Sequence, residues 1–158
     1  MYNSFVSAAE GNRDSYELAI ALAQHNILTK HVTDFYTPDH LIKYFSLFKN
    51  NLLFQKFLNR NHFHLPSEKV QISKKTLSYF LIKYLLFKKA NANFSQNIIS
   101  KAALDVANKN NAGMFLYAGY AFYAYKNDKR KDRPKVLIQY HPHIDQSSKI
   151  ILRDLEKY

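Results

Sequence analysis

Two histidines lie where an apolar segment ends, because Val136–Tyr140 is followed directly by His141, Pro142 and His143. Histidine can donate hydrogen bonds to sugar hydroxyls or to phosphate oxygens, and the proline ring fixes the backbone between the two imidazoles. A metal site would need a cysteine or carboxylate partner at a recognisable spacing, and the sequence offers none, so we expect no metal. The alternative is that one or both are ordinary loop histidines.

The loop Glu10–Arg13 contains one glycine, Gly11, and precedes a helical pattern. Backbone N–H groups at the start of a helix can hold a phosphate, and the guanidinium of Arg13 would add a positive charge. The spacing is neither that of a dinucleotide-binding fingerprint nor that of a P-loop. The alternative is a plain tight turn, in which Asp14 caps the following helix and Glu17 completes a capping box.

Other candidate groups each allow two interpretations. Asp34 lies inside the strand-end sequence Thr33–Tyr36 and could point into a ligand cleft or only shape a turn. The aromatic residues within 117–125 could stack on sugar rings or bases, although such runs usually pack in a core. The basic segment Lys126–Lys135 could face phosphate or a membrane surface, or could be a solvated loop. His62 and His64 are expected in a solvated loop.

Short apolar segments alternate with amphipathic ones along the chain, and this alternation is typical of an α/β fold. The predicted strands are residues 4–9, 31–36, 69–73, 114–118 and 136–140. The predicted helices are residues 14–26, 37–58, 77–90, 95–110 and 120–125, with a last one from residue 145. We therefore expect one Rossmann-like domain over residues 1–158, with a mostly parallel sheet and helices on both faces. Ligands of such sheets bind beyond the carboxyl ends of the strands, where the loops with Gly11, Asp34 and His141 would lie.

The composition is that of a folded, basic protein. The chain has 158 residues, of which 47% are hydrophobic, so it can build the core of one domain. It contains no cysteine, which excludes a disulfide framework, a thiolate zinc site and a cysteine nucleophile. Neither a signal peptide nor an apolar run of about 20 residues is visible, and we expect a cytoplasmic protein. The net charge of +11 predicts attraction to polyanions, unless it reflects only a general bias toward lysine.

Three segments together resemble one enzyme family. Glu10–Ala23, continued by Val32–Pro38, resembles the opening of bacterial family 4 glycosyltransferases, and Pro134–His143 resembles a cleft-facing strand of the same N-terminal domain. Members of this family are retaining, metal-independent enzymes of the GT-B fold, which has two Rossmann-like domains. The N-terminal domain binds the acceptor and the C-terminal domain binds the nucleotide-sugar donor. The resemblance therefore implies the acceptor-binding half of a glycosyltransferase that needs no cofactor.

The resemblance also implies roles for individual residues. The loop facing the donor phosphates would hold Gly11, Asn12 and Arg13. The residue beside the transferring sugar would be His141 or His143. The acceptor contacts would be Asp34, Tyr36 and Tyr120. The sequence departs from the family pattern at the first loop, where many relatives have two glycines.

The partners that the resemblance implies are a nucleotide-sugar donor and a sugar or lipid-linked acceptor. The acidic E-x7-E motif and the Arg/Lys pair of the donor-binding domain are not found in this sequence, so we expect the chain to need that C-terminal domain for activity. A lipid-linked acceptor would place the basic domain at the inner face of the membrane, as a peripheral protein. The alternative function is a small polyanion-binding or nucleic-acid-binding module. Nucleic acid is not the expected partner, because no recognisable binding motif for it is present.

Overall fold

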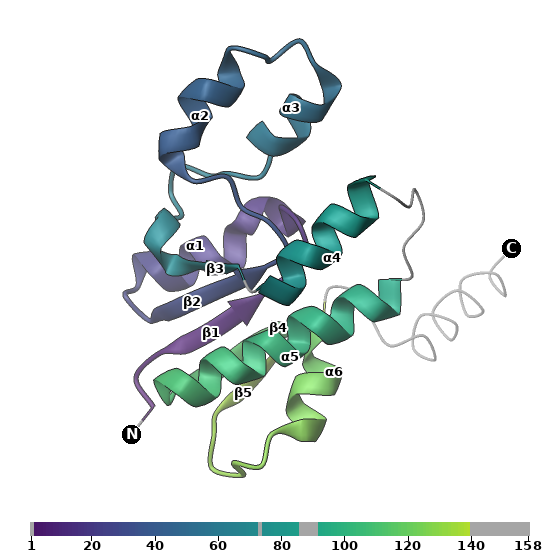
Figure 1. Ribbon diagram of the computed structural model, residues 1–158. Helices are drawn as coiled ribbons and strands as arrows, with labels where there is room; N and C mark the ends of the chain where they lie inside the picture. The colour runs from purple at the N-terminus through teal and green to yellow at the C-terminus, as the bar shows by residue number, and fades with distance from the viewer. Residues whose placement is uncertain (1, 73, 86–91, 140–158) are drawn as a thin grey trace, which may run out of the picture.

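The computed structural model describes residues 2–72, 74–85 and 92–139 (Figure 1). Its strands are β1 (Phe5–Ala8), β2 (Leu28–Thr33), β3 (Val70–Ile72), β4 (Gly113–Tyr117) and β5 (Lys135–Ile138). They form one sheet in the order β3-β2-β1-β4-β5, and every pair of neighbouring strands is parallel. The expected α/β, Rossmann-like fold with a parallel sheet is confirmed.

Helices connect the strands and cover both faces of the sheet. The α-helices are α1 (Glu17–Gln24), α2 (Asp39–Ser46), α3 (Leu52–Leu58), α4 (Lys74–Leu85), α5 (Ala92–Asn110) and α6 (Ala118–Asn127). Two short 3-10 turns are η1 (Arg13–Tyr16) and η2 (Ser67–Lys69). Helices α5 and α6 pack against one face of the sheet, and α1 packs against the other. Helices on both faces are therefore confirmed as well.

The two faces of the sheet bury different kinds of side chain. Val6 and Ala8 of β1 belong to the apolar core under α5, whose own contribution includes the small residues Ala103 and Ala107. Small side chains let that helix lie close to the strands, and this is one reason why an alanine-rich sequence packs well there. The opposite face carries a second apolar cluster beneath α1, which includes Leu28 of β2.

Within the described residues, no helix combines the length and apolar character that crossing a bilayer requires.

The predicted helix 37–58 is wrong in one respect, because the structure has two shorter helices there. Helix α2 ends at Ser46 and α3 begins at Leu52, with turns between them. The helical spacing of apolar residues continues across the break, so periodicity alone could not find it. Strand β2 also begins three residues earlier than predicted and ends at Thr33, so that Asp34 and Tyr36 lie in the loop beyond it.

The predicted capping box at the start of α1 is also wrong. Helix α1 begins at Glu17, and Asp14 has left-handed backbone angles (φ 48°, ψ 39°) instead of the extended angles of an N-cap. The N-cap residue of α1 is Tyr16, and its side chain makes no capping hydrogen bond. Ser95 is the first residue of the predicted helix 95–110, but α5 begins at Ala92, so Ser95 lies inside the helix and donates a hydrogen bond to Glu10.

The basic segment before β5 is not simply a solvated loop. The side chains of Asp128 and Arg133 are buried and form an ion pair with an Nη1–Oδ1 distance of 3.4 Å. Lys135 lies 3.2 Å from the other carboxylate oxygen, and Arg133 donates to Asn108 of α5. This buried cluster fixes the connection from α6 to β5. The intervening Lys129 and neighbouring basic residues remain exposed.

Candidate functional site

The strand order reverses between β1 and β4, and we call the region between the loops that follow these two strands the crevice. The chain adds β2 and β3 on one side of β1, and then crosses over to add β4 and β5 on the other side. At such a reversal the two loops that follow the central strands turn in opposite directions and leave a space between them. Open α/β sheets bind their ligands at this place. In this chain it lies between the loop after β1, residues 9–16, and the start of α6 after Tyr117.

The loop after β1 has an unusual backbone. Gly11 has a φ of +71°, and Asp14, Ser15 and Tyr16 have φ values of 48°, 50° and 63°. The left-handed region costs a residue with a Cβ about 1–2 kcal/mol, so three such residues in succession need support from their surroundings. Strain of this kind concentrates at ligand-binding loops. The loop is therefore a candidate ligand loop on conformation as well as on position.

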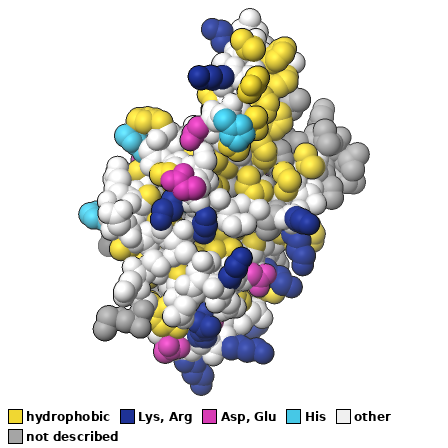
Figure 2. Space-filling model, turned by 60° about the vertical axis from the view of Figure 1, so that its left-hand side comes forward, with side chains coloured by type: hydrophobic (Ala, Val, Ile, Leu, Met, Phe, Trp, Pro, Cys, Tyr) yellow, Lys and Arg dark blue, Asp and Glu magenta, His cyan; other side chains and the backbone are white. Residues whose placement is uncertain are grey.

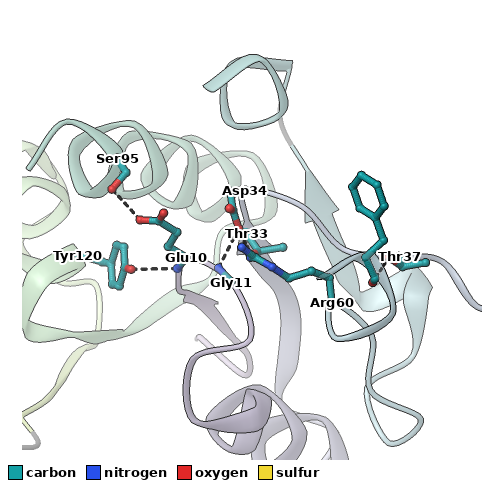
Figure 3. Close-up of polar contacts among 9 residues, drawn as sticks. Glu10, Gly11, Thr33, Asp34, Thr37, Arg60, Ser95 and Tyr120 are labelled. Carbon is teal, nitrogen blue, oxygen red and sulfur yellow. Dashed lines mark hydrogen bonds and ion pairs between the residues drawn. The ribbon is translucent and has the colours of Figure 1, made fainter. Parts of the chain in front are cut away.

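Asp34 holds this loop in place (Figure 3). Its fully buried carboxylate accepts hydrogen bonds through Oδ1 from the Gly11 N–H at 2.8 Å and from the Thr33 hydroxyl at 3.1 Å. Arg60, from the segment after α3, donates to the same oxygen at 2.9 Å. The other carboxylate oxygen is buried and has no hydrogen-bond partner among the described residues. Asp34 thus ties the ends of β1 and β2 to the base of α3.

Gly11 cannot be replaced without disturbing this arrangement. A Cβ built on Gly11 would lie 2.7 Å from Arg60 Nη1, and its backbone has the left-handed angles that favour glycine. Gly119, on the other side of the crevice, is different, because its Cβ would meet only the movable end of Gln96 at 3.0 Å. Of these two glycines, only Gly11 has a backbone conformation that requires glycine.

We predict that Gly11→Ala lowers the free energy of unfolding by about 1–3 kcal/mol, since it combines an unfavourable φ with the contact to Arg60. The matched control is Gly119→Ala, for which a helical position is expected to make alanine neutral or favourable by up to about 1 kcal/mol. Urea denaturation of the two variants measures the difference. Equal losses in both variants would mean that the conformation of Gly11 is not a constraint.

Residues of β4 and α6 face this loop across the crevice. Tyr120 is buried, and its phenol oxygen accepts a hydrogen bond from the Glu10 N–H at 2.9 Å (Figure 3). Burial raises the pKa of the Tyr120 phenol, so it stays neutral and can serve as a fixed hydrogen-bonding group. Ser95 of α5 donates to the Glu10 carboxylate at 2.7 Å. Glu10, near the start of the loop, is thus held by residues of α6 and α5.

Arg13 reaches from the loop after β1 to the end of β4. Its guanidinium carbon lies 5.1 Å from the centre of the Tyr117 ring, which is a cation–π distance. Its side chain is 42% exposed and also lies 3.6 Å from the Asp14 carboxylate. A positive charge that remains accessible to solvent is therefore held in the crevice. That Gly11, Asn12 and Arg13 bind a phosphate stays a prediction.

The other residues singled out from the sequence have different surroundings. Asn12 is exposed and next to Arg13 in the loop. Tyr36 is buried, and its hydroxyl donates to the Leu65 carbonyl at 2.7 Å and accepts from the His62 N–H at 3.2 Å. Burial raises the pKa of the Tyr36 phenol, and the residue packs the loop between α3 and η2. His141 and His143 lie outside the described residues, and their roles stay predictions.

Comparisons of the chain with protein families, with curated proteins and with solved structures found no match.

Arg60 is the residue of this network that the sequence could not indicate. It follows α3, far along the chain from Gly11, and only the return of the chain after the α2–α3 excursion brings it against the loop. The hydrogen bond between Glu10 and Ser95 likewise joins residues far apart in the chain, and their spacing in the sequence could not indicate it. Among the described residues no group of three or more His, Cys, Asp or Glu side chains could hold a metal ion. A hollow of about 530 Å³ between α4 and α5 shares no lining residue with the crevice.

His31 of β2 lies beneath the strained loop and is almost fully buried. Its Nδ1 is 2.9 Å from the Ser7 hydroxyl, and its ring packs edge-on against Tyr16, with ring centres 5.7 Å apart. Burial lowers the pKa of the imidazole from 6.5 to about 4. The imidazole is therefore neutral at neutral pH, and it supports Tyr16 from below as an aromatic surface.

Acid is expected to destabilise the protein through His31. Because the folded pKa lies below the unfolded value of 6.5, the unfolded chain takes up the proton first. The contribution is complete above pH 6.5 and is lost as the pH falls toward 4. We predict that wild type loses about 2–3 kcal/mol more than His31→Gln between pH 7.5 and 4.5, measured by urea denaturation. Parallel losses in the two proteins would contradict a buried neutral histidine.

Proposed function

We propose that this chain is the acceptor-side half of a GT-B glycosyltransferase, and that sugar transfer takes place against the crevice between β1 and β4. The observation that supports this most is the position of Arg13. Its accessible guanidinium rests on Tyr117 in the crevice, two residues after the left-handed Gly11. A cation at the reversal of strand order suits a ligand that carries phosphate.

The chemistry of sugar transfer explains why a cation is useful there. Transfer from a nucleotide sugar breaks the bond between the sugar and a nucleoside diphosphate, and negative charge grows on the departing phosphate oxygen. A fixed positive group stabilises that charge without having to reorganise during the reaction. In this proposal Arg13 and the exposed residue Asn12 beside it face the diphosphate, while a second Rossmann-like domain binds the rest of the donor.

Buried residues keep this loop ready for the reaction. The Asp34–Arg60 pair holds Gly11, and the Tyr120 hydroxyl together with Ser95 holds Glu10. The start of the loop is thereby fixed before any substrate binds, which reduces the ordering that binding requires. In this proposal the acceptor lies on the side of the crevice that this domain forms. A peripheral, cytoplasmic enzyme would reach a lipid-linked acceptor from the inner face of the membrane.

Release of nucleoside diphosphate tests the proposal. The protein in its natural form would be incubated with UDP-, GDP-, ADP- and dTDP-sugars and with a total lipid extract as acceptor. We expect one class of donor to be consumed, with label transferred from its sugar to an acceptor. Consumption of none of the donors, together with binding of single-stranded DNA that weakens steeply with salt, would favour the nucleic-acid alternative and overturn the proposal.

A further inference from the structure

The helical hairpin formed by α2 and α3 stands apart from the rest of the domain (Figure 1). The two helices pack mainly on each other, and none of their side chains that the structure describes is fully buried. The base of the hairpin is fixed, since the Thr37 N–H donates to the Arg60 carbonyl at 2.7 Å and the Thr37 hydroxyl donates to Phe57 at 2.6 Å. The hairpin is thus a defined projection with a firm attachment.

An aromatic cluster makes the projection rigid. Phe45 of α2 stacks on Phe57 of α3, with ring centres 5.4 Å apart, and Phe48 stacks on Phe54 at 5.0 Å. Phe57 also contacts Phe35 at the end of β2. These rings supply the contact between the two helices. The outward-facing side chains are therefore presented by a small, ordered scaffold.

The tip of the hairpin is apolar and positively charged. Tyr44 is 63% exposed and Leu47 is 76% exposed, and Phe48 remains half exposed despite its stacking. Lys43 and Lys49 are exposed beside them, and residues 40–60 contain no Asp or Glu. Figure 2 shows hydrophobic side chains spread over the upper lobe, which is the α2–α3 region, with basic side chains next to them. Exposed apolar side chains gathered in this way mark a surface that contacts something.

We propose that the tip of the α2–α3 hairpin is a docking surface for an anionic lipid bilayer. Aromatic and leucine side chains favour the zone between lipid headgroups and acyl chains, and lysines beside them favour anionic headgroups. The helices are too short to cross a bilayer, so the hairpin rests in its surface. A second copy of this chain is a poor occupant, because a twofold contact would bring lysines together without any acidic residue to pair with them.

The position of the hairpin connects this surface to the crevice. Helix α2 follows β2, so the hairpin rises from the carboxyl edge of the sheet, and its base residue Arg60 touches Gly11 of the crevice loop. Docking would therefore bring the crevice near the lipid headgroups. The docking surface specifies the membrane location that the proposed function includes, and its significance for sugar transfer rests on that proposal. Lipid binding can be measured without sugar transfer, so the two proposals can fail separately.

Sedimentation with vesicles tests the docking surface in the full chain. Wild type should bind vesicles of about 30% phosphatidylglycerol in phosphatidylcholine, because the negative surface of such vesicles attracts basic proteins. The variant Tyr44→Ser/Leu47→Ser should bind about tenfold more weakly, since it removes apolar contact without touching the aromatic cluster. The matched control is Phe122→Ser, at a residue 73% exposed on α6, and its binding should equal that of wild type.

A tryptophan reporter locates the contact independently of variants that weaken binding. The chain contains no tryptophan, so Leu47→Trp and Phe122→Trp each carry a single tryptophan, whose emission is recorded. With anionic vesicles, we expect a blue shift and quenching by brominated lipid for Leu47→Trp only. Equal responses at both positions, or no vesicle binding by wild type, would overturn the proposal. Loss of a dimer in the hairpin variant, with no lipid binding by wild type, would instead assign the surface to contact between copies.

Discussion

Replacing Asp34 by Asn is expected to lower the free energy of unfolding by about 3–5 kcal/mol. The carboxylate is fully buried, and the Arg60 guanidinium that it pairs with at 2.9 Å is largely buried too. Removing the negative charge leaves that guanidinium facing a neutral amide in a region with little solvent. The Gly11 N–H would also exchange a charged acceptor for a neutral one.

A double-mutant cycle separates the pair from the rest of the effect. The variant Asp34→Asn/Arg60→Gln should regain part of the stability that Asp34→Asn loses, because it leaves no uncompensated charge. Asp105→Asn, on the exposed side of α5, is the matched control and should change the stability by less than about 0.5 kcal/mol. Urea denaturation measures wild type, the single variants Asp34→Asn and Arg60→Gln, the double variant and the control. A loss below about 1 kcal/mol for Asp34→Asn would show that this ion pair does not hold the loop.

Replacing Arg13 by Ala is expected to reduce sugar transfer by about 100- to 1000-fold while leaving the fold intact. The side chain is 42% exposed, so its removal leaves no buried charge behind. Its proposed task is to stabilise the charge that develops on the departing diphosphate, and this stabilisation is needed mainly in the transition state. The loss should therefore appear in kcat more than in KM.

Two variants separate a specific role from general charge. Arg13→Lys keeps the positive charge but loses the planar stacking on Tyr117, and it should retain part of the activity. Lys129→Ala removes the same charge from an exposed position in the basic segment, and its turnover should equal that of wild type. The assay is release of nucleoside diphosphate by the natural form of the protein. Equal losses for Arg13→Ala and Lys129→Ala would reduce the role of Arg13 to net charge.

The fold could be predicted from the sequence because several of its strands are short apolar segments. Segments such as Met114–Tyr117 are bounded by turn residues and alternate with amphipathic helices, and that alternation permits few architectures. The positions of the crevice loops then followed from the rule that ligands bind at the carboxyl ends of parallel strands. The loop of Gly11 and the end of β4 at Tyr117 and Tyr120 do lie together in the structure.

Features that depend on distant contacts could not be predicted. Asp14 and Glu17 have the spacing of a capping box, but the loop is fixed by Asp34 and Arg60 and takes left-handed angles instead. Arg60 belongs to the network only because the hairpin returns to the crevice. Asp128 is buried in a segment whose many charges suggested solvent, since its partner Arg133 is also bonded to α5. In each case tertiary contacts outweighed the local signal.

The central claim is that phosphate-bearing substrates bind in the crevice between β1 and β4. The most direct measurement is the change in backbone amide NMR signals when inorganic pyrophosphate is added to the ¹⁵N-labelled chain. We predict that the amide signals of Gly11, Asn12 and Arg13 shift with a common saturation curve, and that Arg13→Ala abolishes these shifts. Shifts confined to the exposed basic segment around Lys129, with the Gly11 loop unchanged, would contradict the account.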